Sequence, residues 1–402
     1  MGILEGGWHT PAIVCKLGLV ISLAGTASCT VFFFMVLVAT WQFRRSAKAK
    51  SSGHSLPDSA WPAVSLLKPV HGLEARLAEN IESFFLQDYP HYQILFAADE
   101  PDDAALPLVR EICARYPNIP SRVLVTGNPP WPNPVAYGFH RMAEVAEHNI
   151  LVTSDSDVAV SPQYLRDVVP PLLNPEIGMV TCLYRGKNAG GFWSGLSAIG
   201  MSVEMTSGVL VANMLEGMKF GLGPTIAVRK DSVASIGGYK SLGDYYANDF
   251  MIGNLIDKAG FRVVLSGHVI DHVVPPMSFS SMWNNQIRWA KSTRYSRPKG
   301  HLGSGLIFAM PYGILGCVSA LLLGHPVLAL SLLGAALLNR VIEGWVIGWG
   351  IVRDPQALWA PWLYPIRDLL GFIVWCASYL GARSVWGDHH YKLLAEGRIV
   401  RE

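Results

Sequence analysis

Acidic residues in the central part of the sequence stand where carboxylates could do chemistry. Asp155 and Asp157 close the apolar run "NILVTSDSD", with one residue between them. Alternate residues of an extended chain point the same way, so this pair predicts a site for a divalent cation and a nucleotide diphosphate. Asp99 ends another apolar run, and Asp249 follows in "YANDF". A later carboxylate of this kind can take a proton from an acceptor hydroxyl.

Simpler interpretations exist for these residues. Asp99 and Asp249 each precede a predicted helix, where an aspartate often serves only as the N-cap. The pair Arg288 and Trp289 lies in "NNQIRWAKS", a basic segment with flanking tryptophans. That segment predicts either an interfacial helix with its cations on anionic lipid, or an Arg-Trp element that closes over a diphosphate.

The region from about residue 52 to 280 must position these side chains. Short apolar runs alternate there with amphipathic helical stretches, beginning with "AVSLLKPV" and "LAENIESFFL". This alternation predicts an α/β fold with a mostly parallel, Rossmann-like sheet and helices on both faces. Ligands of such sheets bind beyond the carboxyl ends of the strands, where Lys68, Asp99 and Asp155 fall.

Composition places part of the chain in lipid. Of the 402 residues, 50% are hydrophobic and only 15% are charged, with a mean hydropathy of +0.29. The net charge of +2 excludes a strongly basic nucleic-acid binder. The six cysteines lack the spacing of a zinc site or of a disulfide framework, and isolated buried thiols are expected.

The first apolar segment predicts a transmembrane anchor. After a short tail at 1–16, residues 17–43 contain no charged side chain and exceed the ~20 residues that a helix needs to cross a bilayer. A basic group with Arg44, Arg45, Lys48 and Lys50 follows directly. By the positive-inside rule, the central domain is expected to face the cytoplasm.

Further membrane segments are expected after the domain. Residues 281–300 predict an interfacial helix, 302–350 a transmembrane hairpin broken at Gly324–Pro326, 364–383 a transmembrane or re-entrant helix, and 384–402 a tail. Arg340 and Glu343 lie one turn apart in the predicted hairpin. They are expected either to form an intramembrane ion pair or to snorkel to a membrane interface.

One more apolar stretch lies inside the domain. The Gly/Met-rich segment "GFWSGLSAIGMSVEMTSGVLVANM" predicts either an acceptor-side helix at the membrane surface or an ordinary buried helix.

Taken in order, these motifs resemble a known family. The series D, DxD, D, (Q/R)xxRW is that of membrane-bound family-2-type glycosyltransferases, and the chain resembles ceramide glucosyltransferases and bacterial hopanoid-biosynthesis glycosyltransferases. The likeness runs from "VSLLKPVHGLE" and "NIESFFLQDYP" through "VRKDSVASIGGY" to "QIRWAKSTR" and "YPIRDLL", which covers most of the chain.

The resemblance implies a GT-A domain that uses a UDP-sugar, such as UDP-glucose, with Mg²⁺ or Mn²⁺, and that inverts the anomeric carbon. The expected acceptor is a membrane lipid such as a ceramide or a hopanoid. Matched by motif, Asp99 would contact the uracil or ribose, and Asp155 with Asp157 the metal and diphosphate. Asp249 would be the general base, with Arg288 and Trp289 as catalytic partners that steady the leaving diphosphate. The remaining residues assigned to donor binding are Lys68, Glu74 and Asn133.

Two positions depart from the family pattern. Val135 replaces the lysine of an Asn-Pro-Lys sequence, and Asn285 replaces the first Gln or Arg of (Q/R)xxRW, with Gln286 one place later. Because of these changes, a non-catalytic membrane scaffold stays open as a hypothesis. Two enzymatic activities besides ceramide glucosylation also stay open. They are transfer of N-acetylglucosamine to a hopanoid-type lipid and processive polysaccharide synthesis, which the few predicted spans disfavour.

Overall fold

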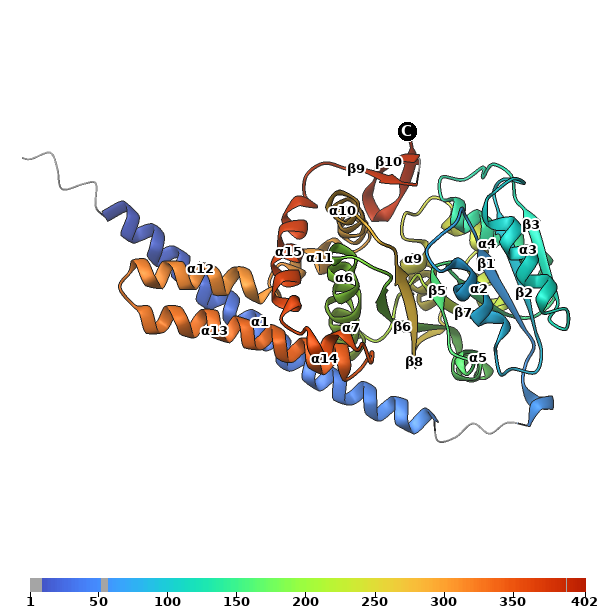
Figure 1. Ribbon diagram of the computed structural model, residues 1–402, viewed down its shortest axis with the longest axis horizontal. Helices are drawn as coiled ribbons and strands as arrows, with labels where there is room; N and C mark the ends of the chain where they lie inside the picture. Colours follow the sequence, from blue (N-terminus) through green and yellow to red (C-terminus); the bar gives the residue numbers. More distant parts are fainter. Residues whose placement is uncertain (1–8, 52–56, 388) are drawn as a thin grey trace, which may run out of the picture.

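The computed structural model describes residues 9–51, 57–387 and 389–402 (Figure 1). Residues 1–8 of the predicted tail and 52–56 at the start of the predicted domain lie outside the described residues. An α/β domain forms one side of the molecule, and long apolar helices extend from it as an arm. The domain therefore corresponds to the alternating part of the sequence, and the arm to its long apolar segments.

An eight-stranded sheet forms the centre of the domain, in the order β3-β2-β1-β4-β7-β6-β8-β5. Its strands are β1 (Val64–Pro69), β2 (Tyr92–Ala98), β3 (Ser121–Val125), β4 (Ile150–Ser154), β5 (Val158–Ala159), β6 (Ile177–Asn188), β7 (Thr225–Arg229) and β8 (Arg262–Val274). Strands β1 to β4 pair in parallel, as do β6 and β8, whereas β7 is antiparallel to β4 and β6, and β5 to β8. The predicted α/β fold with a mostly parallel sheet and helices on both faces is confirmed.

Helices cover both faces of the sheet because successive strand residues point in opposite directions. In β1, Leu66 packs in one core and Leu67 in the other. The helices of the domain are α2 (Leu77–Phe85), α3 (Ala105–Arg115), α4 (Pro134–Val145), α5 (Tyr164–Val168), α6 (Phe192–Ile199), α7 (Thr206–Glu216), α8 (Lys230–Ser235) and α9 (Asn248–Lys258), with short helical turns η1 (Asp58–Ala60), η2 (Pro170–Leu173) and η4 (Tyr239–Leu242).

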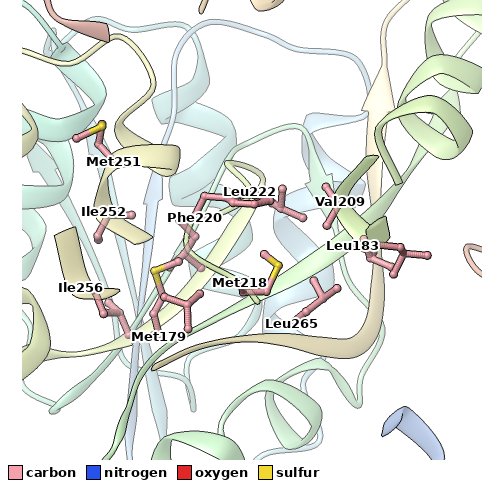
Figure 2. Packing of buried hydrophobic residues seen from close by; sticks show 14 of the residues in the cluster. Met179, Leu183, Val209, Met218, Phe220, Leu222, Met251, Ile252, Ile256 and Leu265 are labelled. Carbon is pink, nitrogen blue, oxygen red and sulfur yellow. The ribbon is translucent and has the colours of Figure 1, made fainter. Parts of the chain in front are cut away.

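The larger core fixes helix α9 against the sheet (Figure 2). Phe220 and Leu222 of the loop before β7 belong to the same buried cluster as Met251 and Ile252 of α9. Each of these four side chains is less than a tenth exposed. This packing matters for the site, because Asp249 lies in the first turn of α9.

The helical arm combines α1 (His9–Ser51), α12 (Ala309–Leu322) and α13 (Pro326–Glu343), which continues as the π-helical turn η5 (Gly344–Trp349). Small residues bring the first two together, since a Cβ on Gly25 of α1 would lie 2.2 Å from the Tyr312 ring. Residues 12–47 and 326–349 are long and apolar enough to cross a membrane. Helix α1 begins at His9, so residues 9–16 of the expected tail are helical.

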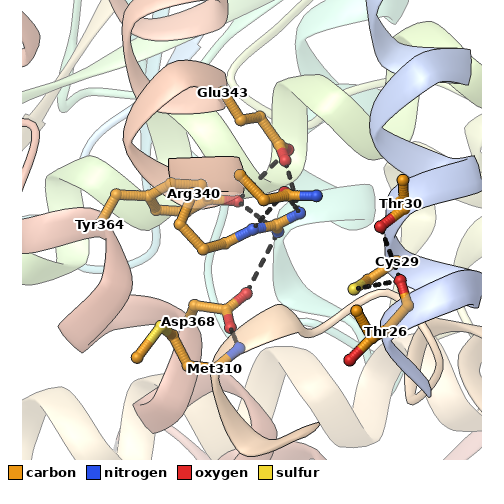
Figure 3. A network of polar contacts seen from close by, with 9 residues as sticks. Thr26, Cys29, Thr30, Met310, Arg340, Glu343, Tyr364 and Asp368 are labelled. Carbon is orange, nitrogen blue, oxygen red and sulfur yellow. Dashed lines mark hydrogen bonds and ion pairs between the residues drawn. The ribbon is translucent and has the colours of Figure 1, made fainter. Parts of the chain in front are cut away.

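A buried group of charged side chains, which we call the helix cluster, connects α13 of the arm with α15 (Leu363–Ala377): Arg340, Glu343 and Asp368 (Figure 3). Arg340 lies 2.7 Å from Glu343 and 3.2 Å from Asp368, and each of the three side chains is at most 2% exposed. The predicted pair of Arg340 and Glu343 is thus confirmed over the snorkelling alternative. Asp368, which also accepts a bond from the Met310 amide at 2.8 Å, adds a second carboxylate.

Several helices join the arm to the domain. The Gly/Met-rich stretch forms α6 and α7, linked by the π-helical turn η3 (Gly200–Met205), and it passes between the sheet and α15 (Leu363–Ala377). It is apolar enough to span a membrane, yet 78% of its most apolar window is buried inside the protein. The remaining helices of this region are α10 (Phe279–Ser296), α11 (Pro298–Ser304) and α14 (Gln356–Trp359).

The C-terminal residues, expected to be a tail, form a small antiparallel sheet instead. It consists of β9 (Arg383–Trp386), β10 (His389–Leu393) and β11 (Ile399–Arg401), in the order β11-β10-β9, with the turn η6 (Ala395–Gly397) before β11. Its buried side chains Tyr391, Leu393 and Ile399 pack with Tyr246 of the domain. The apolar positions alternate over too few residues to have predicted these strands.

Candidate active site

The first two carboxylates lie where the strand pattern predicted them. Asp99 directly follows β2, and Asp155 directly follows β4. Thr126, just beyond β3, donates a hydrogen bond to a carboxylate oxygen of Asp99 at 3.0 Å. Because β1, β2 and β4 are parallel neighbours, their carboxyl ends place both aspartates along one edge of the sheet.

Lys68 of β1 stabilises the segment around Asp155 through a contact with its main chain. Its ammonium is fully buried, donates to the main-chain carbonyl of Asp155 at 2.6 Å and lies 3.8 Å from the centre of the Phe84 ring. Burial lowers the pKa of Lys68 to about 7, against the charges of Asp155 and Asp157 that favour the ammonium. Lys68 thus contacts the protein rather than the open side of the site.

Asp155 and Asp157 respond differently to their surroundings. Burial, and then the charge of Asp157, raise the pKa of Asp155 to about 7. Burial acts on Asp157 in the same direction, but the ring of His272 outweighs it, so the pKa of Asp157 is lowered. The His272 Nε2 atom lies 2.9 Å from a carboxylate oxygen of Asp157. We call Lys68, Asp155, Asp157 and His272 the donor cluster.

His272 was not predicted from the sequence. It lies near the end of β8 and reaches the pair because β5, the strand after Asp157, is hydrogen-bonded beside it. Its Nδ1 atom and the second oxygen of Asp157 have no hydrogen-bond partner among the described residues. These free buried atoms suit a site that binds a further polar group.

Glu74, assigned to donor binding, is electrostatically connected to the same cluster. Although Glu74 is exposed, partial loss of solvent around its carboxyl, and then the charge of Asp157, raise its pKa, while a bond from Ser156 opposes the shift. Tyr184 of β6 lies on another side, its ring centre 5.5 Å from that of His272. Burial, followed by the charges of three aspartates including Asp249, raises the pKa of Tyr184.

Asp249 joins the site from α9. The N-cap of that helix is Ala247, so the simple capping role for Asp249 does not apply. Its carboxylate accepts hydrogen bonds from the amides of Phe250, Asp249 itself and Gly223, yet burial outweighs them and raises its pKa.

Two glycines allow this close approach of the loop before β7. The Gly221 amide donates to the Asp249 carbonyl at 3.1 Å, and a Cβ there would lie 2.6 Å from that carbonyl oxygen. A Cβ on Gly223 would lie 2.9 Å from a carboxylate oxygen of Asp249. The sequence "FGLGP" therefore encodes a contact with a residue far along the chain.

Arg288 and Trp289 face different neighbours from α10. Arg288 lies beside the Tyr246 hydroxyl and 6.0 Å from the Trp386 ring centre. Burial lowers the pKa of Arg288, although Tyr246, Asp157 and Asp249 favour the charged guanidinium. Trp289 packs against a small cluster that contains Ala198, Met201 and Val274.

The remaining predicted positions have structural partners. Asn133 is fully buried, caps α4 by accepting from the Ala136 amide at 3.0 Å, and donates to the Tyr245 carbonyl at 2.7 Å. Both ends of its amide are thus used inside the protein, unlike the expected donor contact. Val135 packs against the larger core. Gln286, next to Asn285, accepts a hydrogen bond from Arg367 at 2.8 Å and donates one to Ser197. Its side-chain amide is thus bonded to other parts of the protein.

Comparison with known proteins identifies the family. The model of glycosyl transferase family 21 matches residues 26–399, nearly the whole chain. The chain belongs to glycosyl transferase family 21. Membership of family 21 makes it a hexosyltransferase of the ceramide glucosyltransferase-like group, and its apolar helices make it a membrane-associated one.

Individual relatives of this family 21 chain are distant. Ceramide glucosyltransferase 1 of Caenorhabditis elegans is 24% identical over 352 residues, 85% of this chain and 74% of the relative. Ceramide glucosyltransferase 3 of the same organism is 24% identical over 385 residues, 92% and 80% respectively. Among solved structures, the mannosyltransferase of Pyrobaculum calidifontis in complex with GDP-Man and Mn²⁺ superposes with a TM-score of 0.47 at 19% identity, covering 88% of this chain and 98% of that one.

Proposed function

We propose that this family 21 chain moves a single glucose from UDP-glucose to the primary hydroxyl of a ceramide-like membrane lipid, with inversion and with Mg²⁺ or Mn²⁺. One observation carries the proposal: the loop before β7 links Asp249 to the donor cluster, because an added Cβ on Gly223 would lie 2.9 Å from the Asp249 carboxylate and the next residue, Pro224, accepts a hydrogen bond from the Asp155 amide at 3.2 Å. A proton acceptor thus stands beside a predicted diphosphate site. The names of the two nematode relatives support ceramide as the acceptor.

Donor binding is assigned to the edge of the sheet. Asp99 would take the uracil or ribose, and Asp155 with Asp157 would hold the cation, which when bound offsets charge on the diphosphate. No three His, Cys, Asp or Glu side chains converge at ligand distances within residues 9–51, 57–387 and 389–402. Diphosphate oxygens would therefore supply other ligands. The Lys68 ammonium holds the segment around Asp155 by donating a hydrogen bond to the Asp155 carbonyl at 2.6 Å.

The transfer step uses Asp249 as the base. Its carboxylate takes the proton of the acceptor hydroxyl while that oxygen attacks the anomeric carbon and the bond from this carbon to the diphosphate oxygen breaks. A raised pKa makes Asp249 a better proton acceptor than an ordinary aspartate. One displacement without an enzyme nucleophile inverts the anomeric centre. The guanidinium of Arg288 would bind the departing UDP as a planar fork, with Trp289 beside it.

The membrane arrangement supports a cytoplasmic donor site. Arg44 and Arg45 follow the apolar part of α1, and Arg44 donates to the Gly350 carbonyl at 2.6 Å, at the end of the other long apolar helix. Positive charge at this end favours the cytoplasmic side by the positive-inside rule. The apolar helices α6 and α7 lie between the domain and the arm, where a lipid acceptor would approach.

Product analysis tests the proposal. The purified full-length protein would be incubated with UDP-glucose, UDP-galactose or UDP-N-acetylglucosamine, each with ceramide or a hopanoid alcohol, with and without Mn²⁺. We expect one hexose added to ceramide from UDP-glucose only, detected by mass spectrometry. A hopanoid product with N-acetylglucosamine would reassign both substrates, a ladder of masses would indicate a processive synthase, and the absence of any product would leave a scaffold.

A further inference from the structure

The C-terminal sheet contacts the segment that precedes Asp249. The Ile399 amide donates to the Asp244 carbonyl at 2.8 Å, and the Tyr246 amide donates to the Gly397 carbonyl at 2.9 Å. Tyr245 and Arg398 form an antiparallel bridge between these two bonds. The chain from Asp244 to Tyr246 is therefore held like an extra strand beside β11, three residues before the proposed base.

Tyr246 connects this sheet to the Arg-Trp helix. Its ring, 5% exposed, packs edge-on against Trp386 and Tyr391, with ring centres 5.5 and 5.9 Å away. Its hydroxyl hydrogen-bonds with the Ser384 hydroxyl of β9 at 2.8 Å and lies beside the guanidinium of Arg288. One side chain thus joins the segment before Asp249, the C-terminal sheet and Arg288.

The sheet is also attached to α10 directly. Lys291 donates to the Arg383 carbonyl at 2.8 Å, and the Arg288 guanidinium lies 6.0 Å from the Trp386 ring centre. The turn η6 lies against the end of the helix, since a Cβ on Gly397 would lie 2.6 Å from the Ser296 hydroxyl oxygen. Gly397 has φ +77°, a conformation that favours glycine.

We infer that Tyr246 and Trp386 are positioning residues that aim Arg288 at the leaving diphosphate, and that the C-terminal sheet holds these two side chains in place. This inference rests on the proposed function for the role of Arg288. A long flexible guanidinium loses orientation unless its donors are held, and Tyr246 with Trp386 supply one acceptor and one aromatic face. The last residues of the chain therefore shape the site from outside the α/β domain.

Removing one hydroxyl tests the positioning role. In the full-length protein, Tyr246→Phe keeps the ring packing and removes the hydroxyl that lies beside Arg288 and bonds with Ser384, so we expect kcat to fall about tenfold while KM for ceramide stays unchanged. In an Arg288→Lys background the same change should cost less than about twofold, because Tyr246 acts through Arg288. The matched control is Tyr391→Phe, since the Tyr391 hydroxyl has no partner among the described residues and its loss should leave kcat unchanged.

A second measurement decides the inference without sugar transfer. Hydrogen exchange of the Tyr246 amide should be at least about tenfold faster in Gly397→Ala than in Gly381→Ala, whose glycine also has positive φ but no atom near an added Cβ. Affinity for UDP with Mn²⁺ should fall in Tyr246→Phe and not in Tyr391→Phe. A wild-type protein without transfer activity would overturn the proposed function alone. Equal exchange in the two glycine variants, or equal kcat in the two tyrosine variants, would overturn this inference.

Discussion

The helix cluster and the donor cluster are built in opposite ways. In the helix cluster, one arginine lies between two carboxylates at 2.7 and 3.2 Å, so cation and anions face each other. In the donor cluster, the ammonium of Lys68 instead contacts a main-chain carbonyl, and one oxygen of Asp157 has no partner among the described residues. The first arrangement is closed and structural, whereas the second leaves carboxylate oxygens for a ligand.

Of the changes predicted here, substitution of Asp249, the proposed base beside the donor cluster, should have the largest effect on activity. Asp249→Asn keeps the size and the amide contacts of the side chain but removes the proton acceptor. We expect kcat to fall about 10³-fold, with unchanged affinity for UDP-glucose and an unchanged unfolding midpoint. Steady-state kinetics and calorimetry measure these quantities. Turnover equal to that of the parent protein would rule out Asp249 as the general base.

The helix cluster should show the reverse behaviour. Arg340→Met leaves Glu343 and Asp368 as buried carboxylates without their cation, which should cost about 3–5 kcal/mol of stability. The free energy of unfolding in detergent would be compared with that of Arg383→Ala, which removes the ion pair of an 81% exposed arginine with Glu402 and should cost less than about 1 kcal/mol. Residual folded Arg340→Met should still bind UDP. An equal, small effect in both variants would contradict a structural role for the helix cluster.

Substitutions in the donor cluster should weaken UDP binding while the protein stays folded. Combining Asp155→Ala with Asp157→Ala removes both proposed cation ligands, so Mn²⁺-dependent UDP binding should weaken at least about 100-fold. Lys68 retains its main-chain contact in this variant, and we expect the unfolding midpoint to stay within a few degrees. Calorimetry with UDP, with and without Mn²⁺, measures the effect. Retained Mn²⁺-dependent binding would count against the metal site.

The sequence predicted the residues that follow strands better than those that pairing of distant segments brings to the site, for a physical reason. Asp99 and Asp155 follow buried strands directly, and parallel neighbours bring such ends together, so local pattern was sufficient. His272 enters through pairing of β5 with β8, and Tyr246 through contacts with the C-terminal sheet. Such contacts between distant segments leave no periodic signal, because a lone histidine or a short polar strand has no pattern that distinguishes it.

The smallest predicted effect on kcat should come from the contact between Gly223 and Asp249. In Gly223→Ala the added Cβ would lie 2.9 Å from the Asp249 carboxylate, which must therefore shift by a few tenths of an ångström. We expect kcat to fall about tenfold with UDP affinity unchanged, because proton transfer depends on the position of the base. Gly138→Ala is the matched control, since a Cβ there meets no atom within 4 Å. Equal kcat in the two variants would mean that Asp249 tolerates displacement, which a general base at the reacting hydroxyl does not.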